Sequence, residues 1–282
     1  MPSCIINGRE MHYLDQGEGF PLLLAHSILW DGRVWGPQLK LLSQHFRCIV
    51  PDLWSHGQSQ PVNESDLSIA RLAEDYHLLM QQLGIDRYSV LGMSTGGLWG
   101  ALLAMTYPDE VASLTLISSY LGAENPENHG DLLQLINMVE PMGEIPAEVL
   151  DAIVELFFTD HTQALYPALV ETLRFDLMFL QPAQISGIAA LCRVLLQRQS
   201  LLDEVATIRC PILLVAGEHD RLHRQTEAEE MYQLMPESQF HWIENAGHML
   251  TLEQPDQVNP LLARFLASVD GVEVDMSKLV FL

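Results

Sequence analysis

Basic side chains are scarce in this sequence. Its 282 residues include 14 Lys and Arg against 37 Asp and Glu, which gives a formal net charge of −23. This surplus of negative charge repels phosphate backbones and anionic lipid surfaces, so we expect neither a nucleic-acid partner nor a membrane partner. The same surplus disfavours a strongly anionic substrate.

Cysteines are also few, and long apolar runs are absent. Cys4, Cys48, Cys192 and Cys210 show neither C-x-x-C spacing nor the density of a disulfide framework, so the sequence predicts free thiols in a reducing compartment. No leader-like segment follows Met1, and no uninterrupted apolar run reaches about 18 residues. We therefore expect a cytoplasmic protein without a membrane span.

Hydrophobic residues make up 48% of the chain, enough for a large buried core. In the first 120 residues, strand-like runs alternate with segments of helical spacing, and the same alternation returns after residue 205. This order predicts an α/β fold with a mostly parallel eight-stranded sheet flanked by helices. The predicted strands span residues 4–6, 10–14, 21–25, 47–51, 88–92, 111–118, 212–216 and 239–243. The predicted helices span residues 35–42, 67–83, 95–107, 226–234 and 257–266.

Residues 121–205 show only helical periodicity, with breaks at Pro141, Gly143 and Pro182. An all-helical segment within an α/β pattern predicts a lid inserted over the carboxyl edge of the sheet. The core domain would then comprise residues 1–120 and 206–282. The alternative is a set of further helices packed on a sheet face. The tail of residues 267–282, strand-like at 279–282, has no predicted place.

A possible nucleophile lies in the string Gly92-Met93-Ser94-Thr95-Gly96, which matches G-x-S-x-G. The string alone is only suggestive, but here it joins a predicted strand to a predicted helix. Such a tight turn exposes the serine hydroxyl at the top of the sheet, and glycines on both sides avoid collisions across the turn. The alternative is an ordinary glycine-rich turn.

A serine hydroxyl needs a base, and the base needs an orienting carboxylate. His248 follows the predicted strand 239–243, and Asp220 follows the strand 212–216. The chain order of serine, acid and histidine is the one this arrangement requires. Glu218 is a rival for the acid. His219 and His223 stand four residues apart, but no third ligand is near in the sequence, so we expect no metal site.

These segments together resemble the α/β-hydrolase superfamily, in the branch of 3-oxoadipate enol-lactonases, carboxylesterases and MenH-like enzymes. The resemblance covers nearly the whole chain outside the predicted lid. It implies a catalytic triad of Ser94, Asp220 and His248, an oxyanion hole formed by the backbone N–H groups of Thr95 and Ile28, and no cofactor. The matching stretches are residues 22–35, 52–59, 91–99, 211–220 and 244–255.

The substrate pocket is less specified by the sequence. Trp30 follows the expected oxyanion loop and Met93 precedes the nucleophile, whereas Phe157 and Phe179 lie in the predicted lid. Core packing is the alternative for each of them. His26 is expected to support the oxyanion loop by hydrogen bonding.

The function expected from these observations is hydrolysis of a neutral carboxylic ester or lactone through an acyl-enzyme. Enol-lactonase, carbon–carbon bond hydrolase and perhydrolase chemistry would use the same triad and stay open. A ligand-binding sensor with slow turnover is the alternative of another class. The sequence leaves both a monomer and a homodimer open.

Overall fold

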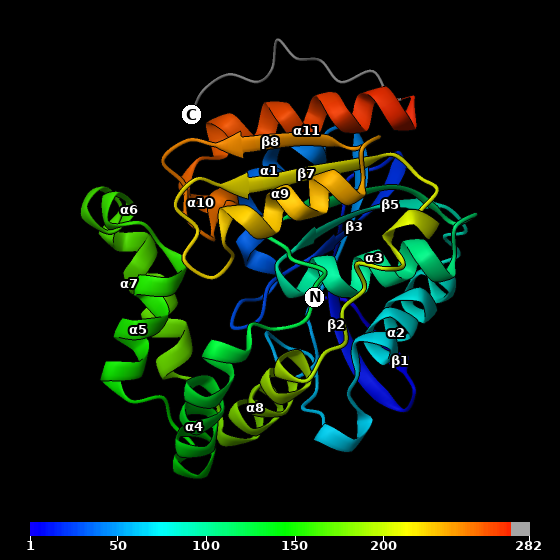
Figure 1. Ribbon diagram of the computed structural model, residues 1–282. Helices are drawn as coiled ribbons and strands as arrows, with labels where there is room; N and C mark the ends of the chain where they lie inside the picture. Colours follow the sequence, from blue (N-terminus) through cyan, green and yellow to red (C-terminus); the bar gives the residue numbers. More distant parts are fainter. Residues whose placement is uncertain (272–282) are drawn as a thin grey trace.

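An eight-stranded sheet lies at the centre of the structure, a computed structural model that describes residues 1–271 (Figure 1). The strand order is β1-β2-β4-β3-β5-β6-β7-β8. The pairs β1/β2 and β2/β4 are antiparallel and all other pairs are parallel, which confirms the predicted mostly parallel sheet. The strands are β1 (Ser3–Ile6), β2 (Arg9–Gln16), β3 (Phe20–Ala25), β4 (Phe46–Pro51), β5 (Tyr88–Met93), β6 (Val111–Ile117), β7 (Ile212–Gly217) and β8 (Gln239–Ile243).

Helices cover both faces of this sheet. Helices α1 (Gly36–Leu42) and α11 (Pro255–Asp270) share one apolar cluster with Leu22 and Leu24, whereas Leu23 belongs to the cluster on the opposite face. Because successive side chains of a strand point to opposite faces, a strand covered on both sides is apolar throughout. The opposite face carries α2 (Ile69–Gln82), α3 (Thr95–Thr106) and α9 (Gln225–Leu234).

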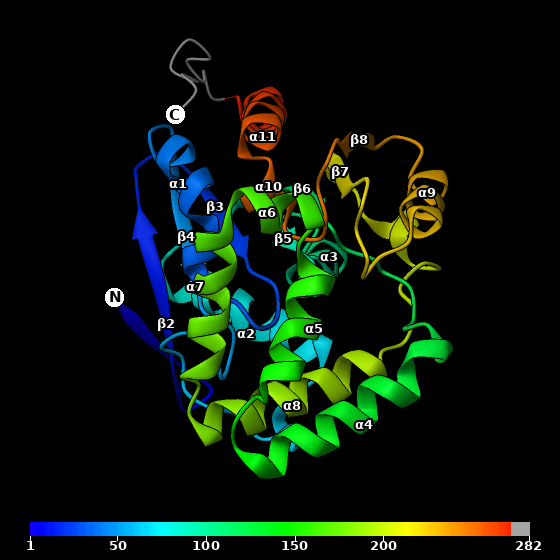
Figure 2. The same ribbon diagram turned by 90° about the vertical axis from the view of Figure 1, so that its left-hand side faces the viewer.

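Between β6 and β7 the described chain contains helices and no strand. We call this segment the helical insertion. Its helices lie to the left of and below the sheet in Figure 1, and the view turned by 90° in Figure 2 shows α5 and α7 in front of the strands. Gly143, with φ of 65°, separates the first two, and Pro182 begins the last. The insertion comprises α4 (Pro126–Met142), α5 (Ala147–Phe157), α6 (Asp160–Leu165), α7 (Pro167–Met178) and α8 (Pro182–Leu196). The domain division at residues 121–205, and a role as lid, stay predictions.

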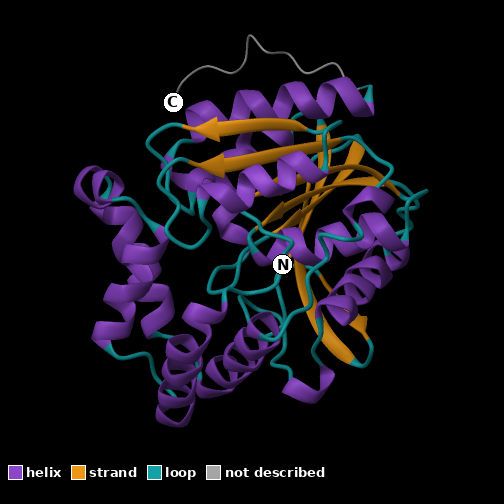
Figure 3. Cartoon of the chain, in the orientation of Figure 1, coloured by secondary structure: helices purple, strands orange, loops and turns teal. Residues whose placement is uncertain are grey.

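Short elements complete the described chain (Figure 3). These are the helix α10 (Leu250–Glu253) and the 3₁₀ turns η1 (Gly32–Trp35), η2 (Glu64–Asp66) and η3 (Val205–Thr207). The predicted strand at 279–282 lies outside the described residues. No single helix among residues 1–271 is long and apolar enough to cross a membrane; α7 and α8 reach that length only together, across a bend of 105°.

Candidate active site

Ser94 stands at a strained turn between β5 and α3. Its φ of 52° and ψ of −117° lie outside the regions that most residues adopt. A Cβ on Gly92 would lie 2.6 Å from the Gly96 carbonyl oxygen, and one on Gly96 would lie 2.3 Å from the Ala25 carbonyl oxygen. The two glycines are therefore required for the turn that presents Ser94 at the carboxyl edge of the sheet.

His248 and Asp220 form a buried pair at the same edge. The loop after β7 carries Asp220 and the loop after β8 carries His248. The Nδ1 atom of His248 lies 2.9 Å from Oδ2 of Asp220, and their side chains are 0% and 4% exposed. A carboxylate at Nδ1 places the proton there and leaves Nε2 free to accept one.

The Nε2 atom of His248 is buried and has no hydrogen-bond partner within residues 1–271, Ser94 included. A buried polar atom without a partner is costly, so its presence calls for a functional explanation. Catalytic hydrogen bonds are often long in unliganded structures and tighten when substrate binds. The orientation of this pair suits a base that awaits a proton donor.

Backbone N–H groups hold the second carboxylate oxygen of Asp220. Oδ1 of Asp220 accepts hydrogen bonds from the N–H groups of Leu222, at 2.8 Å, and His223, at 3.1 Å. Burial raises the pKa of the Asp220 carboxyl, but the charge and hydrogen bonds of His248 and His223 outweigh burial and hold this pKa below its usual value. The rival carboxylate, Glu218, instead faces the backbone N–H of Asn245 at 3.4 Å.

Two buried histidines hold the loop of residues 26–32, which we call the oxyanion loop after the donor that the sequence predicts there. Nε2 of His26 accepts the Leu53 N–H at 2.8 Å, and Nε2 of His56 accepts the Leu29 N–H at 3.0 Å. Their Nδ1 atoms face backbone carbonyl oxygens, so each ring carries its proton on Nδ1. Leu29 has φ of 67°, an unusual value for a branched residue.

Both rings are neutral at pH 7. Burial lowers the pKa of His26 to about 4 and that of His56 to about 4. Asp52 supplies a third link to the oxyanion loop, because its Oδ1 accepts the Gly32 N–H at 2.9 Å. The sequence anticipates the supporting role of His26 but not that of His56, although His56 lies within the matching stretch 52–59.

Glu253 connects the loop of residues 244–249, which we call the histidine loop, to the helical insertion. Its carboxylate is 3% exposed and accepts the Gly247 N–H at 2.9 Å through Oε1. Its Oε2 accepts the N–H and hydroxyl of Thr159 and the hydroxyl of Thr162. No sequence motif distinguishes this glutamate, because its partners come from a segment about 90 residues away.

A cavity of about 510 Å³ opens beside Ser94. Thr95 and Ile28, the expected oxyanion donors, contribute to its wall. Thr95 is the first residue of α3, so its N–H has no partner within the helix. The size lies within the range of small-molecule sites.

Of the four residues expected in the pocket, Phe157 lines this cavity and its ring also stacks on His248, with centroids 5.5 Å apart. The other three are not among the lining residues. Trp30 packs edge-on against Phe158, Met93 is fully buried beneath the turn, and Phe179 is 59% exposed. Trp30 and Met93 belong to the packed core, and Phe179 lies at the carboxyl end of α7, facing solvent. A role of these three residues in substrate binding stays a prediction.

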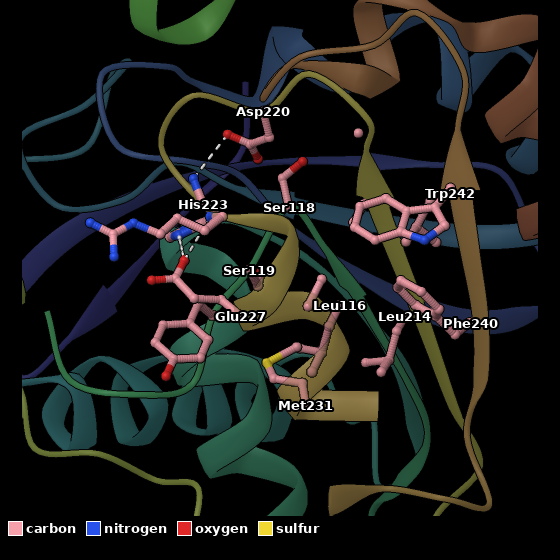
Figure 4. A pocket seen from close by; sticks show the side chains of 16 residues that line it. Leu116, Ser118, Ser119, Leu214, Asp220, His223, Glu227, Met231, Phe240 and Trp242 are labelled. Atoms are coloured by element: carbon pink, nitrogen blue, oxygen red, sulfur yellow. Dashed lines mark hydrogen bonds and ion pairs between the residues drawn. The ribbon is translucent and has the colours of Figure 1, made fainter. Parts of the chain in front are cut away.

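His223 is a second imidazole at the site that the sequence did not assign. Its ring centroid lies 5.4 Å from that of His248, and its Nδ1 lies 3.6 Å from Oε2 of Glu227. Figure 4 shows Asp220, His223 and Glu227 together around a small adjoining cavity of about 20 Å³. Burial raises the pKa of Glu227, but hydrogen bonds and charges from His223 and Arg224 bring it below its usual value.

The four cysteines are free, as their spacing suggests. Cys48 is buried and the other three are half-buried. Burial raises the pKa of the Cys192 thiol, which lines the large cavity, to about 12. A thiol with such a pKa is a poor nucleophile at neutral pH.

Comparison with known proteins agrees with this geometry. Residues 21–255 match the family model described as alpha/beta hydrolase fold. The chain is 31% identical over 251 residues to a protein named putative carbamate hydrolase RutD from Escherichia coli O44:H18, covering 88% of this chain and 90% of the relative.

Two solved structures are similar over nearly their whole length. A thermophilic esterase from Thermogutta terrifontis superposes with a TM-score of 0.85 at 27% identity, covering 95% of this chain and 98% of that one. The enol-lactonase from Burkholderia xenovorans LB400 has a TM-score of 0.85 at 26% identity, with 94% and 100% covered. The chain therefore belongs to the α/β-hydrolase fold family and is an enzyme of the hydrolase type.

Proposed function

We propose that this enzyme hydrolyses a neutral carboxylic ester or lactone through an acyl-enzyme, with Ser94 as nucleophile, His248 as base and Asp220 as its orienting acid. The observation that carries the proposal is the buried His248–Asp220 pair, whose unpartnered Nε2 lies at the sheet edge that also presents Ser94. No cofactor is needed for this chemistry.

In the first step, the Ser94 hydroxyl gives its proton to Nε2 of His248 as Oγ bonds to the carbonyl carbon. The negative charge that develops on the carbonyl oxygen is held by the N–H groups of Thr95 and Ile28. The carbon–oxygen bond to the leaving group then breaks, and the leaving oxygen takes the proton from His248. A water molecule repeats these steps on the acyl-enzyme, which releases the acid and restores Ser94.

The helical insertion acts as the lid of this site in our proposal. Its helices supply most of the cavity wall, and Glu253 fastens the histidine loop to Thr159, the N-cap residue of α6. Excluding water from the cavity strengthens the electrostatic stabilisation of the oxyanion.

Several related reactions would use the same residues. Carbamate cleavage, suggested by the name of the Escherichia coli relative, proceeds by the same attack on a carbonyl carbon. Enol-lactone hydrolysis, carbon–carbon bond hydrolysis and perhydrolysis also share the triad. We favour a neutral ester or lactone because the cavity wall is mainly apolar and its charged side chains are paired.

The direct test compares Ser94→Ala with the wild type on p-nitrophenyl butyrate. The expected loss in kcat is on the order of 10⁵–10⁶-fold, since the members of a triad act as a unit. Ser65→Ala, at an exposed serine of η2, is the matched control and keeps full activity. A fluorophosphonate label located by mass spectrometry should be found on Ser94 alone.

Retention of most esterase activity by Ser94→Ala would refute the assignment. A single labelling event without steady-state turnover would instead favour the slow ligand-binding sensor. The cytoplasmic location, the absence of a membrane or nucleic-acid partner and the choice between monomer and homodimer remain predictions from the sequence.

A further inference from the structure

The large cavity is lined mainly by aliphatic side chains of three helices of the insertion. Helix α4 contributes Leu135 and Val139, α5 contributes Ile153, and α8 contributes Ile188 and Ala189. Ser94, Thr95 and Ile28 also contribute to the wall. The reacting carbonyl would therefore lie where the cavity meets the sheet edge, with a continuous apolar space extending between the helices.

The charged side chains of this wall have partners of opposite charge. Nη1 of Arg198 lies 2.7 Å from Oε2 of Glu124, and this guanidinium is only 6% exposed. Arg221 pairs with Asp160 at 2.8 Å, on the exposed side of the cavity. Since these cations are already paired, the described wall offers no unpaired arginine to a carboxylate on the substrate.

The wall also bears on the orientation of an ester. It includes Ser94 and both expected oxyanion donors, and the buried His248 lies beside the wall residues Phe157 and His223, with ring centroids 5.5 Å and 5.4 Å from its own. The leaving oxygen must approach Nε2 of His248 to take its proton, so the alcohol part lies toward His248. The acyl part is thereby directed into the space between the helices.

We propose that this cavity is an acyl-chain site, and that the substrate carries an uncharged aliphatic acyl chain of about eight carbons or more. At roughly 30 Å³ for each water-sized group, eight carbons occupy about half of the cavity. This inference rests on the proposed esterase function and adds to it the class of substrate and its orientation.

The first experiment measures kcat/KM for p-nitrophenyl esters from acetate to dodecanoate. Each methylene buried against the wall should raise kcat/KM up to about fourfold, with a plateau near or beyond eight carbons. A value that stays flat or falls beyond butyrate would overturn the acyl-chain site.

The second experiment compares ethyl octanoate with octyl acetate, two isomers that differ only in the side of the ester bond that carries the long chain. The orientation predicts at least a tenfold preference in kcat/KM for ethyl octanoate. An equal or opposite preference would refute the inference that the acyl part of the ester occupies the cavity. Monoethyl suberate has a carboxylate in place of the terminal methyl group of ethyl octanoate, and a preference for it over ethyl octanoate would refute the inference that the acyl chain is uncharged.

Variants of α8 locate the site. Ala189→Trp fills the space between the helices and should lower the ratio of octanoate to acetate kcat/KM at least tenfold. Ala183→Trp, at an exposed position in the first turn of the same helix, is the matched control and keeps the wild-type ratio. An unchanged ratio in Ala189→Trp would place the chain elsewhere.

The two proposals fail in different ways. Loss of the acyl-chain preference, with acetate hydrolysis still dependent on Ser94, refutes the acyl-chain site alone. Acetate and octanoate hydrolysis that survive Ser94→Ala refute the proposed function. The substrate comparisons on the wild-type enzyme do not depend on the folding of any variant.

Discussion

Hydrogen bonds at single side chains fix the backbone that surrounds Ser94. His26 and His56 each use one ring nitrogen as donor and the other as acceptor, so neither can take up a proton without losing a buried hydrogen bond. The oxyanion loop therefore depends on two neutral imidazoles. This dependence links stability to pH in the loop that lies beside Ser94.

We expect stability to fall as the pH is lowered from about 6.5 toward about 4, and His56→Gln to remove part of that fall. The pKa of each histidine is lowered from 6.5 to about 4 on folding, so the unfolded chain binds more protons in this window. Each contributes up to about 1.4 kcal/mol per pH unit, present in full above 6.5. Urea unfolding at several pH values measures the slope; the same slope in His56→Gln would contradict the assignment.

A second single-residue variant, Asp220→Asn, tests whether Asp220 is the acid that orients His248. An asparagine amide facing Nδ1 of His248 favours the wrong tautomer, and kcat for an ester should drop by about 10⁴ at neutral pH. Glu218→Gln, the matched control at the rival carboxylate, should retain activity within about twofold, since Glu218 faces only a backbone N–H in the next loop. Equal losses in the two variants would argue against Asp220.

At the scale of the elements, the helical insertion and the sheet meet at the histidine loop. Four donors converge on the Glu253 carboxylate, from Gly247 on one side and from Thr159 and Thr162 on the other. The Met249 N–H also donates to the Phe157 carbonyl oxygen, at 3.2 Å. The position of His248 is thus coupled to the end of α5.

Glu253→Ala should lower both stability and kcat. The substitution leaves the buried Gly247 and Thr159 N–H groups unpaired, at a cost of about 1–3 kcal/mol each. Glu253→Gln keeps an acceptor oxygen, so its losses of stability and of kcat should both be smaller than those of Glu253→Ala. Urea unfolding and steady-state kinetics on the folded protein measure the two effects. Stability within about 0.5 kcal/mol of the wild type in Glu253→Ala would show that these contacts are dispensable.

Charge acts at the scale of the whole molecule. With a net charge of −23, the folded chain repels itself, and salt should screen this repulsion. Raising NaCl from about 20 mM to about 300 mM should increase the free energy of unfolding by on the order of 1 kcal/mol. Urea unfolding at the two salt concentrations provides the measurement. A decrease would mean that attractive ion pairs, such as Arg198 with Glu124, dominate instead.

The sequence by itself determined the order of strands and helices, because apolar periodicity records which face of each element is buried. It also identified Ser94, Asp220 and His248 as candidates, because the carboxyl ends of parallel strands share one edge of a sheet and the glycines around Ser94 allow its turn. The structure brings Asp220 and His248 into contact at that edge.

Only the tertiary structure decided what surrounds these residues. His56 and Glu253 have their places through partners distant in the sequence, and His223 comes to lie beside His248 of another loop. No local pattern distinguishes these three from other polar residues. Phe157 faces the cavity whereas Phe179 faces solvent, although both are apolar residues of the same helical insertion. Periodicity specifies that a helix face is apolar, but three-dimensional packing alone determines whether that face meets another helix, a cavity or water.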